Sequence, residues 1–402
     1  MAKDHILVGL EMGTSKVCVV VGEANADGPI KILGVGQAPS CGIRKGEIVD
    51  FENVHKCVRE AIADAEDKSD VTIKSVFVGV TGSHIHSFNN RGCVNLPEDR
   101  EEIDASDCED VALSARDVNI PPQNAFLHTI LQHYYVDGQE GVLNPVAMLG
   151  RMLEADFHIV HGVGNRIRNT VRCIKELGVE VEDVVFSGYA TAQAILSQQQ
   201  KDLGALVIDI GGGTTDYVVY VDGAVKQSGV LAVGGDHITN DVSMGLRIPM
   251  AKSERLKIEE GDATIGNSLP GETIFLKDET GFAGRDVERE TLNTIIHCRL
   301  RETFELLKRA MDSEPYLPML GAGIVITGGC SQMRGIGPLA QEIFNVPVTV
   351  AHARATSGLV SAAENPQFST AIGLLRYGQA AYANRPQKDG FFEKLRGIFG
   401  RR

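Results

Sequence analysis

The sequence lacks the closely spaced cysteines of a zinc site or a disulfide-rich fold. Its eight cysteines are scattered, and no two are spaced as C-x-x-C. Isolated thiols of this kind are typical of a reducing compartment and argue against a zinc centre. No apolar run reaches the roughly 18 residues that a membrane span requires. The opening residues lead directly into an apolar strand, so we expect no signal peptide.

Positive charge is also in short supply. Lysine and arginine number 39 against 53 aspartates and glutamates, which gives a net charge of −14. This balance argues against a general nucleic-acid binder, so no nucleic-acid partner is expected. Tryptophan is absent, which excludes nothing, and the hydrophobic fraction of 43% is ordinary for a globular chain with a full core. A chain of 402 residues predicts about two to four domains.

The most informative stretch is a glycine-rich turn between two β-branched apolar runs, 206–210 and 217–221. Such runs are typical of paired strands. The glycines are expected to adopt positive φ and to let their backbone N–H groups converge on a phosphate, with two threonine hydroxyls as further donors. These candidate phosphate-binding residues are Gly211, Gly212, Gly213, Thr214 and Thr215.

Two carboxylates flank this turn. Asp209 and Asp216 would repel phosphate, so their presence indicates a divalent cation or an attacking water between them and the phosphate. The alternative is an ordinary hairpin with a glycine-rich turn. An ordinary turn needs only one or two glycines, and it does not explain two acids and two threonines beside them.

The N-terminus carries a shorter copy of the same pattern, from Ile6 to Val21. Glu11 stands where Asp209 stands, and the turn that follows it contains Gly13, Thr14, Ser15 and Lys16. Two such hairpins in one chain predict two similar half-molecules that close on one phosphate chain.

The remaining segments divide into a first block, an insert and a second block. In the first block we expect strands at 17–22, 30–37 and 73–81 and a helix at 50–67. Residues 83–161 predict a small α+β insert with strands at 84–88, 91–97, 126–135 and 153–160 and an acidic helix at 101–116. The histidines of this insert are interpreted as strand-face residues rather than metal ligands: His128, His133, His158 and His161.

The second block alternates helices and strands. We expect helices at 165–177, 187–199, 251–257, 286–311 and 368–381, and a further helix that ends at 344. We expect strands at 182–186 and 224–233, one within 261–285, and one that begins at 324. One helix opens at Gly234 and Gly235, and its free N–H groups and dipole favour an anion. Gly328 and Gly329 would let the backbone approach a flat base or ribose. Glu254 and Lys257 share one helix face, which by itself is ordinary surface decoration.

The C-terminal tail differs from the rest of the chain. A polar linker at 384–390 precedes a segment whose apolar residues fall on one helical face. In an acidic protein such a basic, phenylalanine-rich helix favours an anionic membrane surface over docking on its own body. Its binding would be weak, so stable attachment would require self-association. The residues expected at the membrane are Phe391, Phe392, Lys394, Leu395, Arg396, Ile398 and Phe399.

Together these motifs resemble the actin-like ATPase superfamily, over residues 1–82 and about 162–383. The resemblance implies an α/β fold of two ribonuclease-H-like halves around a nucleotide cleft that binds ATP and Mg²⁺. The resemblance implies that 13–16 and 211–215 are the phosphate loops and that 328–329 is the adenosine motif. It also implies that Glu254 and Lys257 contact the nucleoside. Asp209 would position the magnesium-bound water, with Glu11 as the second metal-side carboxylate.

Within that superfamily the chain resembles the FtsA family of bacterial cell division proteins. The resemblance rests on the segment from Gly9 to Lys16, the insert at 83–161 and the amphipathic tail. It implies subdomain 1A at 1–82, 162–190 and 361–383, 1C at 83–161, 2A at 191–235 and 312–360, and 2B at 236–311. The linker at 384–390 and a membrane-targeting helix at 391–402 complete the predicted organisation.

The family resemblance also implies a function. Members polymerise head-to-tail with ATP bound, tether FtsZ filaments to the cytoplasmic face of the inner membrane at the division site, and recruit later division proteins. The FtsZ tail peptide is expected on 236–311, against the basic residues from Arg285 to Arg301, and the later division proteins on 83–161. The stretch from Ser187 to Ala192 lacks the acid or amide that orients water in hydrolysing relatives, so we expect weak or no ATPase activity.

Three rival interpretations share the fold. A sugar or acetate-type kinase would need a second substrate site and would have no use for the tail. A heat-shock chaperone would need a peptide-binding domain after residue 383, where 19 residues remain of the 402. Another actin-like scaffold, for a pilus or for cell shape, would keep the ATP site but lack the insert or the tail.

Overall fold

We describe a computed structural model of the chain over residues 5–24, 28–266, 269, 271–278, 282–311, 316–354, 356–359 and 364–383. The predicted linker and membrane helix, 384–402, lie outside the described residues. Within these ranges no helix is both long enough and apolar enough to cross a lipid bilayer.

The first half is built on a six-stranded sheet in the order β11-β6-β1-β2-β3-β19. Its strands β1, β2 and β3 form an antiparallel meander, and β6 and β11 continue in parallel beyond β1. The helices α1 (Phe51–Ser69), capped by Asp50, and α3 (Gly164–Lys175) share a hydrophobic core with this sheet. The strands are β1 (His5–Met12), β2 (Lys16–Ala24), β3 (Ile30–Pro39), β6 (Ser75–Val80), β11 (Glu180–Phe186) and β19 (Thr356–Gly358).

The second half repeats this plan in a five-stranded sheet in the order β14-β13-β12-β17-β18. Again a three-stranded antiparallel meander is followed by two parallel strands. The two hairpins singled out in the sequence are β1–β2 and β12–β13, so the prediction of two similar halves is confirmed. The strands are β12 (Ala205–Ile210), β13 (Thr215–Val221), β14 (Ala224–Leu231), β17 (Ile324–Thr327) and β18 (Val348–Val350).

Two helices lie between the sheets. The helix α11 (Ser369–Ala383) packs on the first sheet, α4 (Ser187–Ile195) packs on the second, and the two pack on each other. Their contact is close, because a Cβ on Gly373 would lie 2.0 Å from the carbonyl oxygen of Ala190. A shared core of buried side chains from both sheets surrounds these helices, so the two halves meet over apolar surface as well as at their hairpins.

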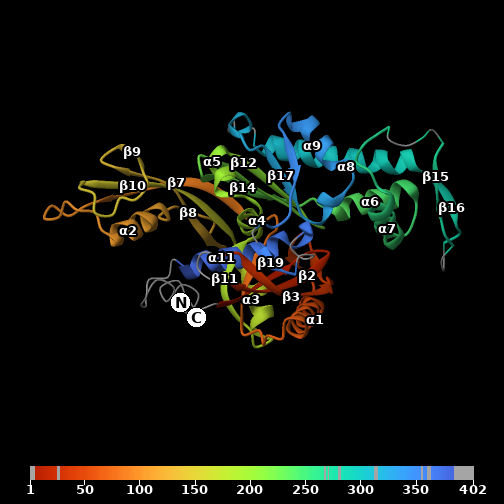
Figure 1. Cartoon of the computed structure of the whole chain (residues 1–402), viewed down its shortest axis with the longest axis horizontal. Coiled ribbons are helices and arrows are strands. Elements are labelled where there is room, and N and C mark those ends of the chain that lie inside the picture. The colour runs from red at the N-terminus through yellow and green to blue at the C-terminus, as the bar shows by residue number, and fades with distance from the viewer. Residues whose placement is uncertain are drawn as a thin grey trace.

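Among the described residues, the outer layer of the second half consists of four helices. They are α6 (Gly235–Leu246), α7 (Met250–Glu260), α8 (Arg289–Ala310) and α9 (Ile336–Phe344). A small hairpin of β15 (Thr273–Leu276) and β16 (Arg285–Glu288) stands beyond them. Figure 1 shows α6, α7 and this hairpin toward one end of the long axis and the insert at the other.

The insert between β6 and α3 has its own sheet, in the order β7-β10-β8-β9, and its own core. The helix α2 (Ala105–Ala115) covers that sheet and begins at a capping box formed by Asp104 and Asp107. All four of the histidines discussed above lie on β8 or β10, as predicted. The strands are β7 (His86–Asn95), β8 (Asn124–Val136), β9 (Gln139–Val142) and β10 (Met152–Val163).

Several predicted boundaries were wrong. The two short strands at 84–88 and 91–97 are the single strand β7. The helix predicted at 187–199 breaks at Leu196, whose ψ of 137° is extended, and the side chain of Ser197 caps a new helix, α5 (Gln198–Leu203). The helix predicted from 286 begins at Arg289, because 285–288 pairs with β15. The acidic helix begins at Ala105 rather than 101.

Candidate functional site

The two hairpin turns approach each other between the halves. Each is closed by one backbone bond, from Gly13 N–H to the Lys16 carbonyl (3.0 Å) and from Gly211 N–H to the Thr214 carbonyl (2.9 Å). A Cβ on Gly213 would lie 2.5 Å from Oγ1 of Thr14. The predicted phosphate loops therefore face each other with almost no space for a side chain between them.

The glycines of the second turn are needed for a reason other than the predicted one. None of Gly211, Gly212 and Gly213 has a positive φ, so the expected left-handed turn was wrong. A Cβ on Gly213 would also lie 2.9 Å from the backbone nitrogen of Lys45, a residue that no sequence motif indicated. Lys45 lies between β4 (Ile43–Arg44) and β5 (Glu47–Ile48), a small hairpin whose Gly46 N–H donates to Oγ1 of Thr14 at 3.1 Å.

Three carboxylates gather behind the turns. Asp209 and Asp216 are cross-strand partners on β12 and β13, and Glu11 lies on β1. Burial raises the pKa of Asp209 and, more strongly, that of Asp216. Burial, and secondarily the nearby charge of Asp209, raises the pKa of Glu11 to about 7. A cation at this position would relieve the repulsion between these groups.

The residues present fit a hydrated magnesium ion. Oε2 of Glu11 is buried and has no hydrogen-bond partner in the described part of the chain, which leaves it available for a ligand. Among the described residues no group of three His, Cys, Asp or Glu side chains is placed to hold a metal directly. Mg²⁺ commonly keeps several waters and uses only one or two carboxylates together with phosphate oxygens, so this arrangement suits Mg²⁺ with a phosphate ligand.

Asp209 is held in place by two hydroxyls. Its Oδ2 accepts hydrogen bonds from Thr191 on α4 at 2.7 Å and from Thr370 on α11 at 2.9 Å. Its Oδ1 lies beside the residue that follows β17, because a Cβ on Gly328 would be only 2.3 Å away. Neither threonine was singled out from the sequence, because no local pattern indicates that two distant helices converge on this side chain.

Lys16 extends toward the start of α11. Its Nζ donates to Oε1 of Gln367 at 2.6 Å and lies 4.8 Å from the centre of the Phe368 ring. Burial lowers the pKa of Lys16, and the nearby Glu11 opposes that shift. An ammonium group beside three carboxylates and two glycine-rich turns supplies part of the positive charge that a phosphate requires.

The start of α6 is placed against the second turn, but not as predicted. The N–H groups of Gly235 and Asp236 donate to the carbonyls of Gly211 and Gly212 at 2.9 and 2.8 Å, so they are not free for an anion. The hydroxyl of Thr215 likewise donates to the Val233 carbonyl at 2.8 Å. Gly234, Gly235 and Thr215 thus fix the shape of the turn, and the prediction of free donors at this helix start was wrong.

Lys257 and Glu254 form an ion pair in which Lys257 is buried and the Glu254 side chain is 42% exposed, so the lysine at least is not surface decoration. Lys257 is 7% exposed, and its Nζ donates to Oε2 of Glu254 at 2.6 Å, to Oγ1 of Thr239 at 2.9 Å and to the Gly235 carbonyl at 3.2 Å. A Cβ on Gly235 would lie 3.4 Å from this Nζ and 3.7 Å from Sγ of Cys330. The pair therefore reaches from α7 to the start of α6 and the turn after β17.

The two glycines after β17 differ from each other. Gly328 has a φ of 88°, which favours glycine, and it lies tightly against Asp209 and Ile210. A Cβ on Gly329 would meet only Gln367, at 4.0 Å. Open space beside Gly329 agrees with a ligand approaching the backbone there.

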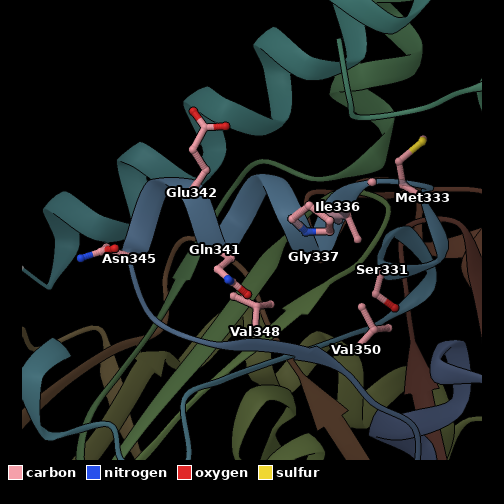
Figure 2. Close-up of a pocket in the computed structure, with 11 residues that line it drawn as sticks. Ser331, Met333, Ile336, Gly337, Gln341, Glu342, Asn345, Val348 and Val350 are labelled. Carbon is pink, nitrogen blue, oxygen red and sulfur yellow. The ribbon is translucent and has the colours of Figure 1, made fainter. Parts of the chain in front are cut away.

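A separate groove lies on the outer side of the second half. It has a volume of about 920 Å³ and runs between α9 and β18, with Ile336, Gln341 and Asn345 on one side and Val348 on the other (Figure 2). None of the predicted nucleotide-binding residues lines it. This groove is therefore distinct from the site between the turns.

Comparison with protein families gives two matches. A family model described as "Cell division protein FtsA" matches residues 206–373, and one described as "SHS2 domain inserted in FTSA" matches residues 82–161. The second match covers the insert with its separate sheet.

Full-length relatives carry the same description. Cell division protein FtsA of Pseudomonas aeruginosa is 38% identical over 392 residues, which covers 98% of this chain and 92% of that protein. FtsA of Neisseria meningitidis is 37% identical over 385 residues, covering 94% and 92%, and FtsA of Escherichia coli K12 is 35% identical over 386 residues, covering 94% and 91%. These relatives are cell division proteins, which gives this chain a role in cell division.

Solved structures with the same fold come from other systems. The PilM–PilN type IV pilus biogenesis complex gives a TM-score of 0.65 at 15% identity, covering 94% of this chain and 99% of the other. MreB5 of Spiroplasma citri bound to AMPPNP gives 0.57 at 15% identity, covering 94% and 98%. These neighbours establish the actin-like fold, and the family models and full-length relatives above are described as FtsA rather than as a kinase or as a pilus or cell-shape protein. With its separate insert and its close full-length relatives, the chain belongs to the FtsA family of cell division proteins.

Proposed function

We propose that this chain is an ATP-binding division protein that assembles head-to-tail on the cytoplasmic face of the inner membrane at the division site. There it tethers FtsZ filaments and recruits later division proteins. The observation that supports this most strongly is the contact between the two glycine-rich turns above Glu11, Asp209 and Asp216. Two turns of this composition, closing over buried carboxylates, fit a magnesium-bound phosphate chain better than any apolar ligand.

The nucleotide would lie across both halves. We assign its phosphates to 13–16 and 211–215, and its adenosine to the space bounded by 234–235, Glu254, Lys257 and 328–329. Asp209 and Glu11 would hold Mg²⁺ through water, and the ion would offset the charge between carboxylates and phosphate. The solved MreB5 structures bound to ADP and to AMPPNP support this assignment only by shared fold.

Hydrolysis is proposed to be slow. The helix α4 begins at Ser187 and contains no carboxylate or amide before Gln193, so it presents no acid near the phosphates. A triphosphate without a group that orients the attacking water reacts slowly. ATP would then act mainly as a ligand that holds the two halves together, with Asp209 as the residue that positions the magnesium-bound water.

We propose the subdivision of the chain given by the family resemblance, in which subdomain 2B (236–311) takes the FtsZ tail peptide and 1C (83–161) the later division proteins. The arginines expected to meet the acidic peptide are engaged within the protein. Arg289 pairs with Glu260 and Glu272, and Arg299 pairs with Asp241. The peptide would therefore have to compete with these internal ion pairs.

The membrane assignment rests on the sequence of 391–402 alone. Five apolar residues on one helical face, with lysine and arginine beside them, suit weak binding to anionic lipid. Assembly of many chains would make that attachment stable.

Co-sedimentation with anionic liposomes and FtsZ tests the whole proposal. The full chain with Mg-ATP is expected to pellet FtsZ with the vesicles, more steeply as its own concentration rises. The double variant Phe392→Glu, Phe399→Glu should leave both proteins in the supernatant, while Gln387→Glu in the linker should behave like the unmodified chain. If all three pellet alike, or FtsZ never pellets, the proposed tether is wrong.

A further inference from the structure

The insert is part of the first half by chain connection but contacts the second half. Its chain leaves after β6 and returns through β10 into α3, so both ends are fixed in the first half. Its strands β7 and β8 nevertheless lie against β14, an edge strand of the second sheet (Figure 1). The insert thus bridges the two halves on the side away from α7.

This insert–β14 contact is a row of polar bonds along the free edge of β14. Backbone carbonyls of β14 accept hydrogen bonds from side chains of three insert residues. The bonds run from Ser87 to Ser228 O at 2.7 Å, from Asn89 to Lys226 O at 2.9 Å and from Gln132 to Val225 O. An edge strand that would otherwise present unpaired carbonyls is therefore satisfied by the insert.

His158 is the buried centre of the contact. It is 1% exposed, and its two ring nitrogens are bonded to Ser228 Oγ and Asn89 Oδ1, both at 2.8 Å. Only the bond from Nε2 to Ser228 crosses the contact, because Asn89 belongs to the insert, as His158 does. Separating the insert from β14 without rehydration would leave Nε2 of His158 and the Ser228 hydroxyl without this bond, at about 1–3 kcal/mol each.

The strand β14 leads directly to the site between the turns. It ends at Leu231, four residues before Gly235, whose N–H donates to the Gly211 carbonyl in the second turn. A displacement of β14 relative to the first half therefore moves the second turn as well.

The insert has a second contact close to the same site. Nε2 of His128 accepts a hydrogen bond from the backbone N–H of Phe186 at 2.9 Å. Phe186 immediately precedes α4, which carries Thr191 to Asp209. The insert therefore contacts one segment from each half, and both segments continue into the candidate site.

We propose that the insert–β14 contact is coupled to the nucleotide that the proposed function places between the halves: nucleotide that binds both turns and holds the halves together favours the docked insert. The halves cannot separate unless this contact breaks or the insert moves with the second half. Because coupling is reciprocal, a partner that binds the insert and releases it from β14 weakens nucleotide binding by the same factor. Division proteins that occupy the insert would then control the nucleotide site of the same molecule.

Hydrogen–deuterium exchange on the full chain tests this, with and without saturating Mg-AMPPNP, at a concentration at which light scattering shows no assembly. Two adjacent asparagines provide a matched pair. Asn89→Ala removes the bonds to Lys226 and His158, whereas Asn90→Ala removes a bond to Ala115 within the insert. Gln132→Ala is the second variant of the contact, should Asn89→Ala fold poorly.

In the unmodified chain, nucleotide should slow exchange at 211–216, at 225–228 and at 86–95. In Asn89→Ala or Gln132→Ala, nucleotide should still protect 211–216 but should no longer protect 86–95. These two variants should also bind AMPPNP several-fold more weakly. The control Asn90→Ala should match the unmodified chain in both measurements. In the unmodified chain, protection at 211–216 without any at 86–95 would refute the coupling and leave the proposed function intact. No protection at 211–216 would refute nucleotide binding between the turns, and the coupling with it.

Discussion

The hydroxyl of Thr191 donates a 2.7 Å hydrogen bond to Oδ2 of Asp209, and the hydroxyl of Thr370 donates to the same oxygen. Each threonine comes from a different helix, α4 or α11, and their own oxygens lie 3.0 Å apart. One carboxylate oxygen of Asp209 is thus bound to the two helices between the sheets. The position of this carboxylate therefore depends on how the two halves are packed together.

Removing the Thr191 hydroxyl should weaken nucleotide binding only when Mg²⁺ is present. Thr191→Val keeps the shape of the side chain but removes one of two donors to Asp209, a loss of about 1 kcal/mol, or roughly fivefold in affinity. Calorimetric titration with ATP, with and without Mg²⁺, measures this. Thr191→Ser restores the donor and should restore the affinity. Equal weakening with and without Mg²⁺ would mean that Thr191 acts on packing rather than on Asp209.

A methyl group at Gly213 should push the two turns apart. Its Cβ would lie 2.5 Å from Oγ1 of Thr14 and 2.9 Å from the backbone nitrogen of Lys45. Overpacking of this kind costs about 1–3 kcal/mol, so Gly213→Ala should lower the melting temperature of the nucleotide-free chain. In the matched variant Gly211→Ala, the new Cβ meets nothing closer than 3.4 Å and should have little effect. Equal melting temperatures for the two variants would show that the turns are not in close contact.

Acid should destabilise the chain through the buried histidines of the insert. Burial lowers the pKa of His158 from 6.5 to about 3, and the pKa values of His128 and His84 to about 4. The folded state therefore keeps these rings neutral, whereas the unfolded chain protonates them near 6.5. These histidines cost the folded state nothing above about pH 6.5. The free energy of unfolding then decreases as the pH drops from 6.5 toward their folded-state pKa values.

Between pH 7.5 and 5.5 each of these histidines should remove about 1.4 kcal/mol from the free energy of unfolding. Urea denaturation at the two pH values measures the total. His158→Gln cannot take up the proton, so its loss should be smaller by that amount. If His158→Gln has the same pH dependence as the unmodified chain, His158 is not held neutral by burial.

ATP turnover should be slow. The helix α4 has no carboxylate or amide before Gln193 that could orient the attacking water. The rate should therefore be on the order of 10⁻³ per second or below, as in nucleoside triphosphatases whose catalytic groups are incomplete. Phosphate release from purified chain with Mg-ATP, against an Asp209→Asn control, measures this. Turnover above about 1 per second that the control abolishes would contradict the structural role proposed for ATP.

The sequence revealed the two hairpins and the repeated halves because their signals are local. Apolar β-branched runs predict strands, and a cluster of glycine, threonine and acid predicts a phosphate turn. The same signals located Glu11, Asp209 and Gly328 in one site. They also assigned the wrong cause to Gly213, since close approach of a distant segment, rather than backbone conformation, requires glycine there.

Contacts between distant segments could not be predicted. Thr370 meets Asp209 across a sequence separation of 161, and His158 meets Ser228 across 70. Nothing in the residues near Lys257 indicated that folding buries it beside Gly235. The break between α4 and α5 was missed because Ser197 is ambiguous between a helix interior and a cap until its hydrogen bond to Gln200 is seen.

A crystal structure of the full chain grown with Mg²⁺ and AMPPNP tests the central claim most directly. The account predicts a triphosphate between 13–16 and 211–215, with Mg²⁺ held through water by Asp209 and Glu11 and the adenosine beside Lys257 and Gly329. A nucleotide bound elsewhere, or no nucleotide at these two turns at saturating AMPPNP, would contradict it.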